Sequence, residues 1–489
     1  MLVQILLCFM CVFVLLLWWF YKLRANESKP PVYPGSYPII GHALTLIGDC
    51  TELWETMKNV SKYSLKVGGI SRMFIATKEF YFITDYEDFL TVMNTCLDKS
   101  FLYDYAKDWC GVGLVTADLT SWKISRKLFG PAFTHRALYR FLDLFNSQAR
   151  TLVNDLASQA GKGEFDHYLP VVGNMLTTVN KSTLGMKNED SCLYDNNYIH
   201  ETESLFDMFA ERFQKFWLAL PFLYNRSNLK RRQDKILDHT KVITWQVINK
   251  QKAEFEAKAK AGNEHVANKD MTVMEIILKS FMNGTFSGED MRQHLETFIF
   301  GSFHTTGTEI VLALKLIGAN PKAEEKIYKE IKEVFGDSDR DVERDDLERL
   351  KYFDAVVKET VRIYPIVPVV ARDTNVDVKL KNYVLPAGSS CIGSIYGLNR
   401  DPMWGEDVEK FKPERWMDPK RPADTMFAGF SLGKRNCIGN YFAIIVMKTF
   451  LVHILRRYRV SADSKEPVMK FNAYLQPVSG HNISLELRS

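Results

Sequence analysis

The residues best suited to chemistry lie between Phe430 and Gly439. Cys437 stands among glycines, and the missing Cβ atoms of Gly433 and Gly439 let main-chain N–H groups approach a sulfur closely. Such donors tune a metal-bound sulfur. Arg435 supplies a fixed positive charge that suits a carboxylate, and Phe430 supplies an apolar wall. These residues suit a metal-bound thiolate, but a lone cysteine of this kind is also typical of a buried structural residue.

The spacing of these five residues matches the haem-ligand signature of the cytochromes P450, and the chain resembles that family from end to end. The resemblance implies a non-covalently bound haem b (iron protoporphyrin IX), with Cys437 as its axial thiolate. Its cofactor contacts would include Phe430, Gly433, Arg435 and Gly439. Because a thiolate ligand pushes electron density onto the iron and favours O–O cleavage, the resemblance implies a monooxygenase.

Three further haem contacts are implied by the resemblance. Trp122 and Arg126 are four residues apart, so they lie on one face of a predicted helix. The family uses this pair to donate to a haem propionate, and Arg372 is expected to reach the other propionate.

A long helix is predicted from Ser287 to Asn320. Ser287 and Asp290 form a capping-box pattern, and Pro321 lies just past the end. In its middle the sequence Gly301-Ser-Phe-His-Thr-Thr-Gly307 departs from good helix formers. We expect it to loosen the helix and open it beside a ligand.

By resemblance this segment is the oxygen-binding groove, with Thr305 as the threonine that helps protonate bound oxygen. The acid that usually precedes this threonine is His304 here, so two roles stay open for His304: a catalytic proton relay, or packing away from the groove. Residues 336–388 resemble the family-4 clan, which includes many arthropod enzymes. Some members carry a haem-esterifying glutamate where Gly301 stands, and glycine cannot make that bond.

The scaffold pattern of the family is also present. Glu359 and Arg362 lie three residues apart, and Arg415 follows in a Pro-Glu-Arg sequence. By resemblance these three residues form a buried Glu-Arg-Arg network that supports the fold and takes no part in the chemistry.

Several segments are candidates for the substrate pocket. Residues 101–116 align with the loop that roofs it, and the candidate lining residues are Phe101, Tyr103, Tyr105, Val367, Val369, Val370, Leu475 and Val478. The apolar run Phe216–Tyr224, followed by Lys230, Arg231 and Arg232, is either core or a segment that dips into a bilayer beside the substrate entrance.

The composition agrees with one large globular domain. Apolar residues make up 46% of 489 residues, and the net charge of +4 argues against a nucleic-acid-coating surface. Eight scattered cysteines suit a reducing compartment. We expect a mainly α fold with small β-sheets, the cytochrome P450 fold, preceded by one transmembrane helix. The expected organisation is a membrane anchor at 1–24, a proline-rich hinge at 25–40 and one catalytic domain at 41–489.

The anchor is predicted from the apolar run Leu2–Tyr21, which is long enough to span a bilayer. Trp18 and Trp19 suit the interface, and Lys22 and Arg24 place the following chain in the cytoplasm. The alternative, a cleaved signal peptide, lacks a basic n-region and a small-residue cleavage site.

The expected function is a haem-thiolate monooxygenase of the endoplasmic reticulum membrane that inserts one oxygen atom of O2 into an apolar substrate, such as a fatty-acid-like lipid, a pheromone or odorant, or a xenobiotic. Without a flavin or Rossmann fingerprint in the chain, electrons would come from NADPH through a separate NADPH-cytochrome P450 reductase, with cytochrome b5 as an optional partner. The candidate docking residues are Lys123, Lys127, Lys434 and Lys448. Two alternatives remain: a reductase-independent isomerase or peroxygenase, and a non-catalytic haem or lipid carrier.

Overall fold

The computed structural model describes residues 28–76, 78–187, 194–260 and 271–488, together with residues 4, 7 and 10–15. Most of the predicted membrane span, Leu2–Tyr21, and of the predicted anchor at 1–24 lies outside these residues. Within the described part of the chain, none of the helices combines the length and the apolar character that a bilayer crossing needs.

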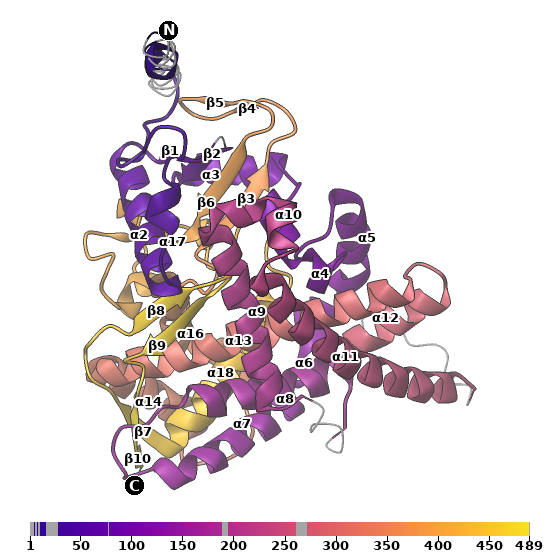
Figure 1. Cartoon of the computed structure of the whole chain (residues 1–489). Helices are drawn as coiled ribbons and strands as arrows, with labels where there is room; N and C mark the ends of the chain where they lie inside the picture. Colours follow the sequence, from indigo (N-terminus) through magenta and orange to yellow (C-terminus); the bar gives the residue numbers. More distant parts are fainter. Residues whose placement is uncertain are drawn as a thin grey trace.

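Helices make up most of the molecule, as predicted (Figure 1). The α-helices of the described chain are α2 (Cys50–Lys66), α3 (Tyr86–Thr95), α4 (Lys107–Cys110), α5 (Leu119–Phe129), α6 (His135–Tyr139), α7 (Leu142–Leu156), α8 (Tyr168–Leu184), α9 (Asn196–Gln214), α10 (Pro221–Tyr224), α11 (Asn228–Lys260), α12 (Val273–Met282), α13 (Gly288–Ala319), α14 (Pro321–Phe335), α15 (Arg344–Arg349), α16 (Lys351–Ile363), α17 (Ile395–Leu398) and α18 (Asn440–Arg457).

The strands form small sheets. The largest has the order β1-β2-β6-β3, in which β1 (Ile70–Ile75) and β2 (Lys78–Ile83) are antiparallel, β2 and β6 (Ser390–Ser394) parallel, and β6 and β3 (Val369–Asp373) antiparallel. The two-stranded sheets are β4 (Val378–Lys379) with β5 (Val384–Leu385), β7 (Tyr458–Ser461) with β10 (Ser484–Leu487), and β8 (Val468–Phe471) with β9 (Leu475–Ser479). Figure 1 shows the large sheet in the half of the molecule near the N-terminus.

Helix α13 crosses the middle of the molecule and packs against α8, α16 and α18 (Figure 1). Its start is fixed by the predicted capping box. The Ser287 hydroxyl accepts from the Asp290 N–H, and the Asp290 carboxylate accepts from the Ser287 N–H. Pro321 begins α14 directly after it, because proline suits the first helical turn.

The two glycines in the middle of α13, Gly301 and Gly307, act differently from the prediction, since the helix is continuous through both. A Cβ on Gly307 would lie 3.2 Å from the Val172 Cα, so Gly307 permits the close packing of α13 on α8. A Cβ on Gly301 would meet nothing within 4 Å. Gly301 therefore leaves space beside the helix because it has no side chain, while the helical backbone stays intact.

The proline-rich segment docks onto the large sheet. The Tyr33 N–H donates to the Arg72 carbonyl at 2.8 Å, and the Arg72 N–H donates to the Pro31 carbonyl at 2.8 Å. The Arg72 side chain also donates to the Pro30 carbonyl at 2.6 Å. Residues 30–33 of the predicted hinge therefore pack on the folded domain.

The predicted Glu-Arg-Arg network is present and fully buried around Glu359. Arg362 donates to both carboxylate oxygens, at 2.8 and 2.9 Å, and Arg415 Nε donates to Oε1 at 2.9 Å. Trp416 Nε1 and the Lys412 N–H complete the shell at 2.9 and 2.8 Å. These bonds hold the pKa of Glu359 below its ordinary value although burial raises it. The network ties α16 to the segment that leads to Cys437.

We expect Glu359→Gln to destabilise the protein by about 3 to 5 kcal/mol, because two buried guanidinium groups lose their counter-charge. Glu348→Gln is the matched control, since its partner Arg344 and Glu348 are both exposed and such pairs contribute about 0 to 1 kcal/mol. Urea unfolding of the holoprotein, followed by tryptophan fluorescence, measures both. Equal stabilities of the two variants would contradict the buried network.

The apolar run Phe216–Tyr224 is mostly exposed, and it forms a short 3-10 helix (Phe216–Ala219) followed by α10. Trp217, Leu220 and Phe222 are 40%, 49% and 57% exposed. Leu218 and Tyr224 are buried and anchor the run. This exposure favours the surface interpretation over the core one.

Candidate active site

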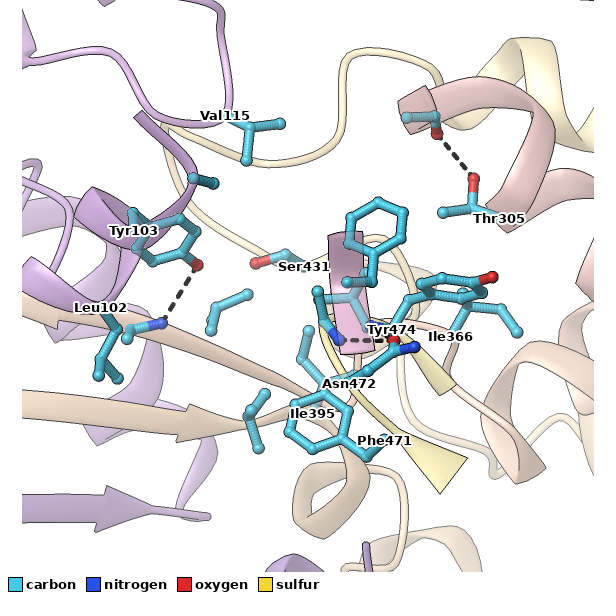
Figure 2. A pocket seen from close by; sticks show the side chains of 18 of the residues that line it. Leu102, Tyr103, Val115, Thr305, Ile366, Ile395, Ser431, Phe471, Asn472 and Tyr474 are labelled. Atoms are coloured by element: carbon cyan, nitrogen blue, oxygen red, sulfur yellow. Dashed lines mark hydrogen bonds between the residues drawn. The ribbon is translucent and has the colours of Figure 1, made fainter. Parts of the chain in front are cut away.

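A cavity of about 500 Å³ lies between α13, α9, β3 and the segment that carries Cys437. Its walls are largely apolar and come from distant parts of the chain. Figure 2 shows Tyr103 and Leu102 on one side and Thr305 of α13 on another. It also shows Phe471 at the end of β8, and Asn472 and Tyr474 from the turn between β8 and β9. The cavity suits a large apolar ligand.

Cys437 lines this cavity, and its side chain is accessible from it. The loop that holds it is closed by a hydrogen bond from the Cys437 N–H to the Phe430 carbonyl at 3.0 Å. Gly433 has φ +78°, and a Cβ there would lie 2.8 Å from Met93 Cβ, so only glycine fits. Gly433 therefore shapes the loop and packs on α3. It is absent from the cavity wall, unlike Phe430, Arg435 and Gly439.

The electrostatics of Cys437 have opposing causes. Burial raises the pKa of its thiol, while the Gly439 N–H and the nearby Arg126 lower it. Gly439 is the N-cap of α18, so the sulfur lies at the N-terminus of this helix, as predicted.

One end of the cavity carries positive charge. Arg372 and Arg435 line it and are nearly fully buried, with 1% and 7% of their surface exposed. Arg372 Nε and Arg435 Nε and Nη2 have no hydrogen-bond partner among the described residues. Lys99 lines the same end. Burial, then Arg372, lowers the pKa of Arg435 to about 10, and burial and both arginines lower the pKa of Lys99.

Trp122 and Arg126 of α5 lie behind this wall rather than in it. Arg126 donates to the carbonyl and side-chain oxygens of Asn436, each at 2.9 Å. The Arg435 guanidinium stacks over the Trp122 ring at 4.5 Å. Both residues were predicted to contact a haem propionate. In this structure Arg126 positions the Cys437 loop, and Trp122 positions Arg435.

Thr305 and His304 both line the cavity, but the His304 ring is held by neighbouring side chains. Thr305 Oγ1 donates to the Gly301 carbonyl at 2.8 Å. The His304 ring is buried, with Nε2 2.8 Å from Thr202 Oγ1 and Nδ1 3.2 Å from the Tyr474 hydroxyl. Burial lowers the pKa of His304 to about 3, so the ring is neutral at neutral pH. His304 joins α13 to α9 and to the β8–β9 turn.

The pocket candidates divide into two groups. Those that line the cavity are Tyr103, Tyr105, Val367, Val369 and Val370. Phe101, Leu475 and Val478 are not part of its wall. Phe101 packs on Phe80, Leu475 is buried in the core, and Val478 is 51% exposed.

The predicted docking role of one lysine is wrong. Lys448 is buried in α18, where its ammonium group donates to the carbonyls of Leu347 and Leu350. It therefore cannot present charge to a partner. Lys123, Lys127 and Lys434 are exposed.

Comparison with known proteins decides the family. The family model described as Cytochrome P450 matches residues 30–484. The chain is 30% identical to "Cytochrome P450 4V2" of Rattus norvegicus over 487 residues, which covers 96% of this chain and 92% of the relative. The chain belongs to the cytochrome P450 family. It is also 29% identical to "Cytochrome P450 4V2" of Homo sapiens, covering 96% of this chain and 92% of that protein, and 30% identical to "Probable cytochrome P450 4s3" of Drosophila melanogaster, covering 86% of each.

These relatives confirm the family-4-like, arthropod-type resemblance, and this cytochrome P450 is a monooxygenase that uses haem with a cysteine thiolate as axial ligand. The residues present fit that group. A thiol projects into the cavity, and unpartnered guanidinium nitrogens at one end lack the anions that two haem propionates would supply.

Among the Lys, Arg, Asp and Glu residues that line the cavity of this cytochrome P450, sequence reasoning missed two. Lys99 lies in no motif, and its place beside Arg372 depends on a β-bridge between the two backbones. Glu309, one turn beyond Thr305 on α13, also lines the cavity. Its spacing of four from Thr305 was a sequence signal that could have identified it.

We expect Lys99→Met to make haem dissociate roughly 10-fold faster or more, since a hydrogen bond between charged groups contributes about 1.5 to 3 kcal/mol. Lys434→Met, an exposed lysine beside Arg435, is the control and should leave the rate unchanged. Transfer of haem to an excess of apomyoglobin gives both rates. If Lys99→Met releases haem no faster than the control, Lys99 does not contact a propionate.

Proposed function

We propose that this cytochrome P450 is an NADPH-dependent monooxygenase of small apolar molecules that takes its electrons from NADPH-cytochrome P450 reductase. The observation that carries the proposal is the placement of Cys437 in the wall of a largely apolar cavity that is also lined by Lys99, Arg372 and Arg435. A haem bound through a thiolate supplies dioxygen binding and cleavage.

In this proposal Cys437 is the axial ligand, and Lys99, Arg372 and Arg435 bind the propionates. Trp122 and Arg126 hold Arg435 and the Cys437 loop in place. Phe430 shields the sulfur from water, and Gly439 directs an N–H toward it. Attachment is non-covalent on the side of Gly301, which has no carboxylate to form an ester.

The substrate class follows from the rest of the wall. The aromatic residues of the cavity wall include Tyr103, Tyr105, Trp109, Phe206, Phe209, Phe213 and Phe300. Burying an apolar ligand against such side chains contributes about 25 cal/mol per Å². A lipid, pheromone-like or xenobiotic molecule fits this lining better than a charged metabolite.

We also propose the predicted membrane arrangement, with an anchor at 1–24, a hinge at 25–40, a catalytic domain at 41–489 and a location in the endoplasmic reticulum membrane. Exposed Trp217, Leu220 and Phe222 support a second contact with lipid. Lys123, Lys127 and Lys434 are the proposed docking residues for the reductase and for cytochrome b5.

Thr305 is the proposed catalytic residue that holds a proton at Oγ1 beside the reacting oxygen. His304 is neutral and bound at both nitrogens, so its proposed role is reduced to holding α13 in register with α9 and Tyr474. The neutral state of His304 also favours a second candidate function, a reductase-independent peroxygenase or isomerase, because the described cavity wall then has no imidazolium to donate a proton.

We expect Thr305→Ala to lower product formed per NADPH by about 10-fold or more and to raise hydrogen peroxide, because a positioned proton-transfer group contributes about 10² to 10⁴ in rate. Thr305→Ser keeps the hydroxyl and should retain coupling. Product, peroxide and NADPH are measured with the wild-type and variant holoenzymes, added reductase and a substrate selected by its Soret shift. Turnover by wild-type enzyme without reductase, or unchanged coupling in Thr305→Ala, would favour the second candidate.

A further inference from the structure

Helix α13 presents three residues to the cavity at intervals of one turn. Gly301, Thr305 and Glu309 are each four residues apart, so they lie in one row on the same face, and all three line the cavity. Thr305 donates its hydroxyl proton to the Gly301 carbonyl at 2.8 Å. The Thr305 oxygen can therefore accept a proton only from its other side, where Glu309 follows.

Glu309 is a buried carboxyl without a counter-charge. The side chain is 6% exposed, and its Oε2 atom has no hydrogen-bond partner among the described residues. The N–H of Ile366 reaches the carboxyl and lowers its pKa, but burial outweighs this bond and raises the pKa well above the ordinary value. Figure 2 shows Ile366 beside Tyr474 in the cavity wall. At neutral pH Glu309 therefore carries a proton into an apolar space.

The other side chains beside Thr305 do not offer a proton. His304 is neutral, and its two nitrogens are occupied by Thr202 and Tyr474. Thr306 and Thr308 are buried hydroxyls without an acidic proton. Thr305 and Glu309 both line the cavity of about 500 Å³, so a water molecule has room beside both side chains.

We propose that Glu309 is the proton-carrying residue of this cavity and that its Oε2 atom supplies Oγ1 of Thr305 through one bridging water. Four helical residues span about 6 Å along the axis, which one water can bridge between two oxygens. Glu309 thereby fills the role that His304 is too engaged to fill. This inference rests on the proposed monooxygenase function.

The proton count requires such a donor. Insertion of one oxygen atom of O2 into a C–H bond, with release of the other as water, consumes two electrons from NADPH and two protons. The Glu309 O–H bond breaks as a new O–H bond forms on the bridging water, which passes a proton to Thr305 Oγ1. The Thr305 hydroxyl gives up its hydrogen bond to the Gly301 carbonyl and transfers its own proton to the oxygen being reduced. A proton from bulk solvent, carried by water in the cavity, then restores the Glu309 O–H bond, and a second pass of the same relay supplies the second proton.

The experiment compares wild-type enzyme with Glu309→Gln, which keeps size and burial but has no acidic proton, and with Glu309→Asp, which keeps the acid. We expect product per NADPH to fall about 10-fold or more in Glu309→Gln, with increased peroxide, and to be partly retained in Glu309→Asp. Soret titration with the same substrate should give equal affinity in all three proteins, because the role is proton supply.

Infrared difference spectra give a readout that does not depend on turnover. The wild-type protein at pH 7 should show the carbonyl stretch of a protonated carboxyl that is missing in Glu309→Gln and shifts in D2O. If that band is absent from the wild type, Glu309 is ionised and the proposal is wrong.

Two other results would also overturn the proposal. Normal coupling in Glu309→Gln would show that the proton comes from elsewhere, and weaker substrate binding with unchanged coupling would make Glu309 a substrate contact. If Glu309→Gln does not fold, the wild-type spectrum and Glu309→Asp decide the question. Failure of the proposed function itself is distinct, because the wild-type enzyme would then yield no NADPH-dependent product.

Discussion

The structure depends on an electrostatic imbalance inside the cavity. Two nearly buried arginines and a lysine face the same space, and three guanidinium nitrogens lack partners among the described residues. Buried charges without partners are costly, so such a cluster is stable only when an anion completes it. The two propionates of haem are carboxylates, which are the anions that guanidinium groups bind well. In the proposed function the cofactor's charged edge lies at Arg372 and Arg435, and the thiol of Cys437 lies in the wall of the same cavity.

The scaffold around this cavity keeps the thiol and the cations in place. The buried Glu359 network joins α16 to the chain before the Cys437 loop, and the Arg126–Asn436 bonds fix the loop itself. On the opposite wall, His304 is held by Thr202 and Tyr474. These two contacts fix the position of α13, on which Gly301, Thr305 and Glu309 also line the cavity.

Local signals predicted much of this arrangement. The capping box at Ser287 and the proline at 321 were sufficient to predict where α13 begins and ends, and the motif around Cys437 was sufficient to predict the loop that holds this cysteine. Each of these signals acts over a few residues. Contacts between distant segments were not predictable in this way. His304 finds its partners 102 and 170 residues away, which no local pattern indicates. Lys448 was misjudged because the carbonyls that capture its ammonium group belong to another helix and the turn after it.

The central claim is that Cys437 holds the haem iron. The most direct test is the absorption spectrum of the reduced, CO-bound protein, compared between the wild type and two cysteine variants that both line the cavity, Cys437→Ser and Cys110→Ser. Thiolate ligation gives ferrous haem–CO a strongly red-shifted Soret band. We predict this band in the wild type and in Cys110→Ser and its loss in Cys437→Ser. A red-shifted band that persists in Cys437→Ser would contradict the account.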